Sequence, residues 1–62
     1  MAFSIDGIPA HLLPLSAKNE FITWIHDLPI DNMAKRRAIT TWRIYNKEPF
    51  TLADYRAAGL AP

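Results

Sequence analysis

The stretch from Asp31 to Lys47 constrains the fold most, because read as a helix it has two different faces. At about 100° per residue, one stripe is apolar and consists of Ala34, Ala38, Trp42 and Tyr45. The opposite stripe is polar and largely basic, and it consists of Arg36, Thr40, Arg43 and Lys47. The pattern predicts an amphipathic helix over 32–47 with Asp31 as its N-cap. One face is expected in a core and the other in solvent.

A second helix is predicted over 16–28. Ser16 follows Pro14 and suits an N-cap, and apolar residues recur at helical spacing from Ala17 to Leu28. Pro29 then ends the helix, because the residue before a proline avoids the α-helical region.

A third, short helix is predicted over 52–58 by its end signals. Thr51 and Asp54 form a variant of the capping box, with Asp in place of the preferred Glu. Phe50 and Tyr55 stand where a hydrophobic staple would join them. Gly59 stands where a left-handed residue commonly ends a helix.

The first fifteen residues are expected to form an extended arm with one short turn at 9–13. No hairpin is predicted, because Pro9 lacks the N–H that a return strand donates. The arm contains six large apolar residues: Phe3, Ile5, Ile8, Leu12, Leu13 and Leu15. They either complete the core or dock on a partner. The first interpretation is favoured, because a chain this short has little other core.

Together these segments predict an all-α fold, a small three-helix domain over 16–62 with the apolar arm 1–15 packed on it. A length of 62 residues allows one domain, and the lack of cysteine excludes disulfides and thiolate metal sites. The predicted core consists of Phe21, Trp24, Ile25, Leu28, Ala38, Trp42, Tyr45, Phe50, Leu52, Tyr55 and Leu60.

The sequence predicts neither an enzyme nor a metal or cofactor site. Ser16, His26 and Asp27 have the residue types of a hydrolytic triad, but Ser16 is expected to cap a helix. His11 and His26 are the only histidines and show no metal-ligand spacing. No signal peptide and no apolar run of about 20 residues is recognised. The expected location is therefore the cytoplasm, or the host cytoplasm if the chain is viral.

Basic residues are concentrated in the central helix. Five of the seven lie in 32–47, and no acidic residue lies between Asn32 and Lys47. This is either an ordinary solvated face or a binding surface. Ile22, Met33, Ile39 and Ile44 lie off the apolar stripes and are expected to stay partly exposed, which favours an interaction site. The alternative is that these apolar residues pack beneath the N-terminal arm. The predicted contact residues are Lys35, Arg36, Ile39, Thr40, Arg43 and Lys47.

The favoured function is a small non-enzymatic regulatory or adaptor protein that binds and modulates a larger protein. Nucleic-acid binding, as a dimer, is the main alternative, because the basic stripe suits a phosphate backbone. Residues 50–62 resemble the first helix and turn of a helix-turn-helix unit. The printed sequence ends where a recognition helix would begin, so no base-reading residue is assigned. A structural subunit of a larger, for example viral, assembly is the third alternative, and homo-oligomers remain open.

Overall fold

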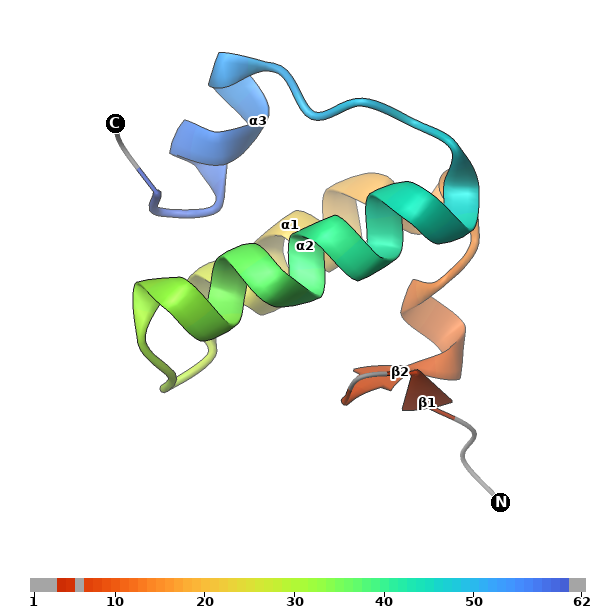
Figure 1. Ribbon diagram of the computed structural model, residues 1–62, viewed down its shortest axis with the longest axis horizontal. Helices are drawn as coiled ribbons and strands as arrows, with labels where there is room; N and C mark the ends of the chain where they lie inside the picture. The colour runs from red at the N-terminus through yellow and green to blue at the C-terminus, as the bar shows by residue number, and fades with distance from the viewer. Residues whose placement is uncertain (1–3, 6, 61–62) are drawn as a thin grey trace.

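Three helices form the body of the protein in the computed structural model, which describes residues 4–5 and 7–60. They are α1 (Lys18–Asp27), α2 (Asn32–Asn46) and the short α3 (Leu52–Ala57). The turn between α1 and α2 reverses the chain, so that α2 runs back along α1, and α3 lies across one side of the pair (Figure 1). The fold is all-α with a short third helix, as the sequence predicts. No helix in the described ranges is both long and apolar enough to cross a membrane.

Helix α1 begins differently from the prediction. A 3₁₀ turn over Leu15–Ala17 precedes it, and its N-cap is Ala17, which makes no side-chain cap. The backbone N–H of Ala17 donates to the Pro14 carbonyl at 2.9 Å. The predicted Ser16 cap is therefore wrong. Pro14 sets the start of the 3₁₀ turn, so Ser16 lies inside that turn and not at the N-cap position of α1.

Helix α2 is capped as predicted at its start. The Asp31 carboxylate accepts a hydrogen bond from the Ala34 N–H at 2.8 Å. The helix ends at Lys47, which adopts a left-handed conformation with φ 52°. The N–H of Glu48 then donates back to the Arg43 carbonyl at 3.2 Å. This turn stops the helix before Pro49 is reached.

The predicted start of α3 is confirmed. Thr51 Oγ1 accepts from the Asp54 N–H at 3.2 Å, and the Asp54 carboxylate accepts from the Thr51 N–H at 2.9 Å. The rings of Phe50 and Tyr55 lie 5.5 Å apart between centroids, as a hydrophobic staple requires. Local hydrogen bonds and one apolar contact thus hold a helix of only six residues.

The end of α3 is a complete Schellman motif. Gly59 has φ +82°, its N–H donates to Arg56, and the N–H of Leu60 donates to the Tyr55 carbonyl at 2.8 Å. A Cβ added at Gly59 would lie 3.3 Å from Cδ2 of His26. The predicted left-handed glycine is therefore confirmed, and it also allows α3 to approach the end of α1.

The N-terminal arm contains a minimal hairpin, so the prediction of no hairpin is wrong. Strands β1 (Ser4–Ile5) and β2 (Ile8–Pro9) pair antiparallel, with Ser4 opposite Pro9 and Ile5 opposite Ile8. Gly7, with φ +82°, lies in the turn. Pro9 is tolerated because it lies in the last pair of a two-pair ladder. Within the described residues, no third strand lies beside it that would require a backbone donor at this position. A 3₁₀ turn at Ala10–Leu12 confirms the short turn predicted for 9–13.

The arm completes the core. Ile8, Leu12 and Leu13 are buried, whereas Leu15 is about half exposed. Nε1 of Trp42 donates to the Leu12 carbonyl at 2.8 Å. Nδ2 of Asn46 donates to the Leu13 carbonyl at 2.7 Å. Ile8, Leu12 and Leu13 thus belong to the core, while Phe3 and the side chain of Ile5 lie outside the described part.

Aromatic rings form the centre of the core. Phe21 stacks on Trp42 with centroids 5.2 Å apart, and Phe50 meets Trp42 edge-on at 5.6 Å. Most predicted core residues are buried or packed against this cluster. Tyr45 and Leu52 are exceptions, being 55% and 53% exposed. Residues outside the predicted core that are buried include Ile22, Ile39 and Ala58.

Candidate binding surface on helix α2

Two of the predicted contact residues belong to the interior. Ile39 is completely buried, so the expectation that it stays exposed is wrong, as it is for Ile22. Lys35 is also buried, and its ammonium donates to the His26 carbonyl at 3.0 Å. Lys35 therefore caps the C-terminal end of α1, where a cation is favoured. Its long aliphatic stem allows this placement on the buried side of α2.

The side chain of Arg43 is partly buried and partly exposed. Its Nη1 donates to the Tyr55 hydroxyl at 3.2 Å, which links α2 to α3. Among the described residues its Nε is buried without a hydrogen-bond partner. Arg43 thus contributes positive charge near the surface, while part of its guanidinium is held inside.

Arg36, Thr40 and Lys47 remain exposed together along α2. Thr40 Oγ1 donates to the Arg36 carbonyl at 2.9 Å. They belong to what we term the outer face of α2, a sector of about 100° of the helix. Its exposed members are Met33, Arg36, Arg37, Thr40, Ile44 and Lys47.

Met33 and Ile44 distinguish this face from an ordinary solvated helix surface. Their side chains are 82% and 72% exposed. The sequence prediction that these two stay exposed is confirmed. Because no acidic residue lies between Asn32 and Lys47, the outer face combines positive charge with two large apolar side chains.

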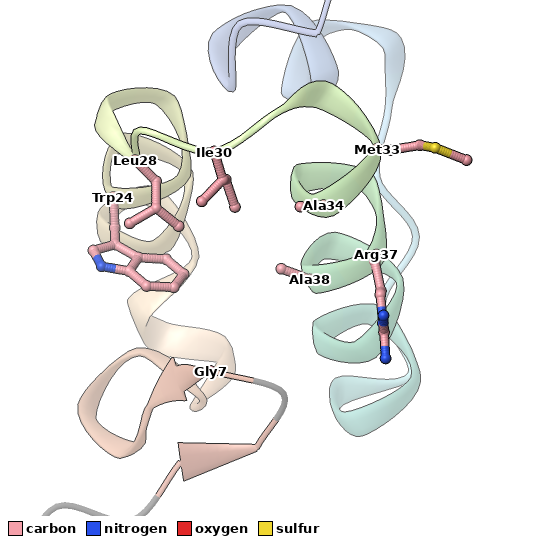
Figure 2. Close-up of a pocket in the computed structure, with 8 residues that line it drawn as sticks. All are labelled: Gly7, Trp24, Leu28, Ile30, Met33, Ala34, Arg37 and Ala38. Carbon is pink, nitrogen blue, oxygen red and sulfur yellow. The ribbon is translucent and has the colours of Figure 1, made fainter.

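A groove borders the outer face, between α1 and α2. Its volume is about 630 Å³. Its lining is mainly apolar and consists of Gly7, Trp24, Leu28, Ile30, Met33, Ala34, Arg37 and Ala38. Figure 2 shows Trp24 and Leu28 on one wall and Ala34 and Ala38 on the other, with Met33 and Arg37 directed outward at the rim. Sequence reasoning missed this groove, because its width depends on how the two helices pack.

A shallower cleft lies at the other end of α2. It measures about 400 Å³ and brings together three of the predicted contact residues, Thr40, Arg43 and Lys47. Ile44, Glu48 and Pro49 complete its lining.

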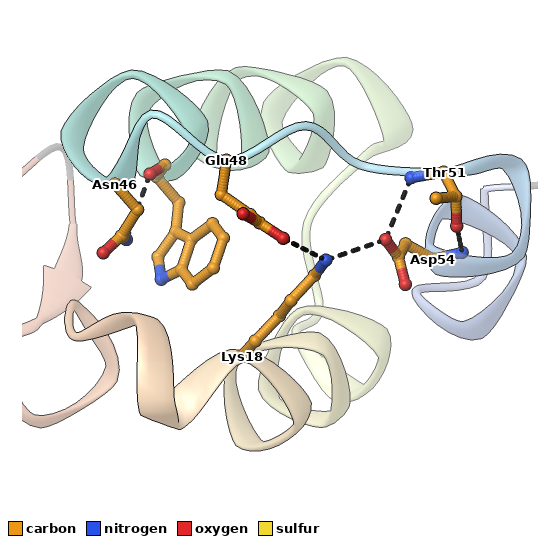
Figure 3. Close-up of polar contacts among 6 residues, drawn as sticks. Lys18, Asn46, Glu48, Thr51 and Asp54 are labelled. Atoms are coloured by element: carbon orange, nitrogen blue, oxygen red, sulfur yellow. Dashed lines mark hydrogen bonds and ion pairs between the residues drawn. The ribbon is translucent and has the colours of Figure 1, made fainter.

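A lysine from α1 bridges two acidic residues, Glu48 in the lining of this cleft and Asp54 of α3. Lys18 Nζ lies 3.0 Å from Asp54 Oδ2 and 3.4 Å from Glu48 Oε2 (Figure 3). It also lies 5.3 Å from the centroid of the Phe50 ring. The single positive charge of Lys18 compensates one of these two carboxylates, so the cluster as a whole keeps one negative charge beside the cleft.

These contacts shift the pKa values of the groups involved. Burial alone would raise the pKa of Asp54, but the Thr51 N–H and the Lys18 ammonium lower it below its ordinary value. Burial would likewise lower the pKa of Lys18, but its bonds to Asp54 and Glu48 raise it. Both shifts favour the charged form of the side chain, so the ammonium of Lys18 and the carboxylate of Asp54 stabilise each other.

The Asp54 pKa predicts a specific loss of stability in acid. A carboxylate with a depressed pKa stabilises the fold above its ordinary value of 3.8, and this contribution disappears as the pH falls through the lower folded value. We expect Asp54→Asn to flatten the acid side of a plot of unfolding free energy against pH. Urea titrations at a series of pH values measure this. Glu20→Gln, on the exposed side of α1, is the charge-matched control, and an unchanged acid side in Asp54→Asn would contradict the assignment.

No catalytic or metal arrangement connects the other candidate residues. Ser16 lies before α1 and His26 in its last turn, about 15 Å along the helix. His26 Nδ1 instead lies 3.0 Å from Asp27 Oδ1 at the exposed end of α1. Residues 4–5 and 7–60 contain no cluster of three His, Cys, Asp or Glu residues suited to a metal ion.

No protein-family model, curated protein or solved structure matches this chain. A function therefore rests on the geometry and charge of the chain itself, and the outer face of α2 is its most distinctive surface.

Proposed function

We propose that this chain is a small non-enzymatic adaptor or regulatory protein, and that it binds a larger protein through the outer face of α2. The exposure of Met33 and Ile44 carries the proposal. Covering such a side chain with a partner is worth about 1.5–3 kcal/mol. Exposed apolar groups rimmed by polar residues are typical of interaction sites.

The chemistry of the outer face defines the partner. Arg36, Arg37 and Lys47 carry positive charge on this face. An acidic surface with two apolar depressions, spaced for Met33 and Ile44, complements it in both shape and charge. A second copy of the chain suits it less, because two outer faces in contact would bring like charges together at a cost of several kcal/mol. The proposal places this complex in the cytoplasm, which fits a chain without cysteine.

Nucleic-acid binding is supported by fewer residues than the sequence suggests. Of the basic residues in 32–47, Lys35 is buried and Arg43 is partly held by Tyr55. A phosphate backbone would also leave Met33 and Ile44 in water. A protein therefore suits the outer face better than nucleic acid does, and the experiment below includes nucleic-acid binding as one of its outcomes.

Substitutions on the outer face should abolish partner binding without affecting the fold. We expect Met33→Ser/Ile44→Ser and, separately, Arg36→Glu to reduce partner recovery about ten-fold or more, equivalent to about 1.4 kcal/mol. Their thermal midpoints should stay near that of the wild type, because the replaced side chains are exposed. Affinity capture from expressing cells with quantitative mass spectrometry measures the recovery.

Matched controls make this result specific. Leu15→Ser/Leu52→Ser removes two exposed apolar side chains elsewhere, and Arg56→Glu reverses an exposed charge on α3. Equal recovery by outer-face variants and wild type, or equal losses in the controls, would overturn the proposal. Titration with duplex DNA forms the second arm. An affinity for DNA that falls steeply with salt and is unchanged in Met33→Ser/Ile44→Ser would favour nucleic-acid binding instead.

A further inference from the structure

We infer that the groove between α1 and α2 receives one large apolar side chain, aromatic or branched aliphatic, from an acidic segment of the partner. This inference rests on the proposed function and adds a second, distinct contact to it. The outer face would hold the segment, and the groove would anchor it.

The walls of the groove have the form of a side-chain receptacle. Trp24 and Leu28 project from α1, and the facing positions on α2 are occupied by the small residues Ala34 and Ala38 (Figure 2). Because the two alanines are one helical turn apart, they leave one continuous depression opposite the larger side chains. Ile30, itself 40% exposed, lies between the two walls near the turn that joins α1 to α2 (Figure 2).

The size and lining of the groove favour an apolar occupant. A volume of about 630 Å³ falls within the roughly 300–1,000 Å³ of sites that enclose a ligand. Water in an apolar depression finds few hydrogen-bond partners, so an apolar side chain displaces it favourably. A single buried anchor of this kind commonly dominates the energy of an interface.

The position of the groove favours an acidic segment. Met33 belongs both to the lining of the groove and to the outer face, so the two surfaces adjoin at this residue. Arg37 also lines the groove, and Arg36 precedes it on the outer face. Among residues 4–5 and 7–60, none of those lining the groove is acidic. Glu or Asp residues beside an apolar anchor therefore complement the site.

A random peptide library displayed on phage tests the inference without knowledge of the partner. Selection on the wild-type chain should enrich peptides that combine acidic residues with one aromatic or branched aliphatic residue. Synthetic copies of these peptides should bind Ala34→Phe at least about ten-fold more weakly, because the new ring takes up space beside Trp24 and Leu28 that the anchor side chain needs. Ala53→Phe, the same change at an exposed position on α3, should leave their affinity unchanged.

A second variant covers the case in which Ala34→Phe disturbs the fold. Ile30→Glu places a negative charge in the lining of the groove, and Leu15→Glu is its control at another exposed apolar position. Ile30→Glu should also weaken the peptides about ten-fold or more. Thermal unfolding of every variant identifies any loss of fold.

The possible results separate this inference from the proposed function. If the peptides bind Ala34→Phe and Ile30→Glu as tightly as the wild type but do not bind Met33→Ser/Ile44→Ser, the inference about the groove is wrong. The proposed role of the outer face is then still supported. Peptides with the opposite dependence would support the groove and count against the outer face. If no peptide is enriched above an empty support, the inference is overturned.

Discussion

Trp42→Ala should leave the chain largely unfolded at 25 °C. Trp42 is fully buried, stacks on Phe21, meets Phe50 edge-on and donates to the Leu12 carbonyl. Removing a buried tryptophan costs about 3–5 kcal/mol, and a core this small supplies about that much stability in total. Far-UV circular dichroism with and without a stabilising osmolyte measures the loss of helix.

Two related variants separate the causes of that loss. Trp42→Phe keeps an aromatic ring but leaves the Leu12 carbonyl without its donor, at a cost of about 1–3 kcal/mol. Trp24→Ala removes the same residue type from a partly exposed position, so this variant should remain folded with a lower midpoint. A Trp42→Ala protein that unfolds cooperatively near the wild-type midpoint would contradict the central place of Trp42.

Ile39→Ala and Ile44→Ala should have very different effects on the free energy of unfolding, although both make the same change on the same helix. Ile39 is completely buried, so its truncation should cost about 2–5 kcal/mol. Ile44 is mostly exposed, so its truncation should change the free energy of unfolding by less than about 0.5 kcal/mol. Differential scanning calorimetry of the two variants measures both effects.

The same pair tests the assignment of the two faces of α2. Ile44→Ala should weaken partner binding while the fold is intact, because it removes half of the apolar contact proposed for the outer face. Similar losses of stability in both variants would mean that Ile44 is also packed in solution.

The sequence predicts the helices well because their end signals are local. The Asp31 cap, the Thr51–Asp54 capping box and the Gly59 turn involve residues at most a few positions apart. The hydrogen bonds of each signal form between groups about one helical turn apart, so the signal can be recognised without knowledge of the rest of the fold. The Ser16 cap was wrong for a related reason, because a 3₁₀ turn after Pro14 is as compatible with the local sequence as a direct helix start.

The buried side of α2 was harder to predict. The expected stripe contains Tyr45, whereas the observed one contains Lys35 and Ile39, a rotation of roughly 50°. The exact direction in which a helix turns its apolar side depends on the elements that cover it. Here the N-terminal arm, through Leu12 and Leu13, and the end of α1, through His26, determine it.

The exposure of the candidate contact residues was accordingly predicted in part. Arg36, Thr40 and Lys47 are exposed together as expected, while Ile39, Lys35 and part of Arg43 are used by the fold. The groove beside them could not be read from the sequence. Its walls come from two helices, and the gap exists only because Ala34 and Ala38 face Trp24 and Leu28 after packing.

The placement of the two tryptophans gives the protein two independent optical probes. Trp42 lies in the dry core and Trp24 in the wall of the groove. With Trp24→Phe, the remaining indole emission should shift to longer wavelength only when the whole fold opens. With Trp42→Phe, the emission of Trp24 should shift to shorter wavelength when an apolar group enters the groove. Unfolding and occupancy can thus be followed separately in solution without an attached dye.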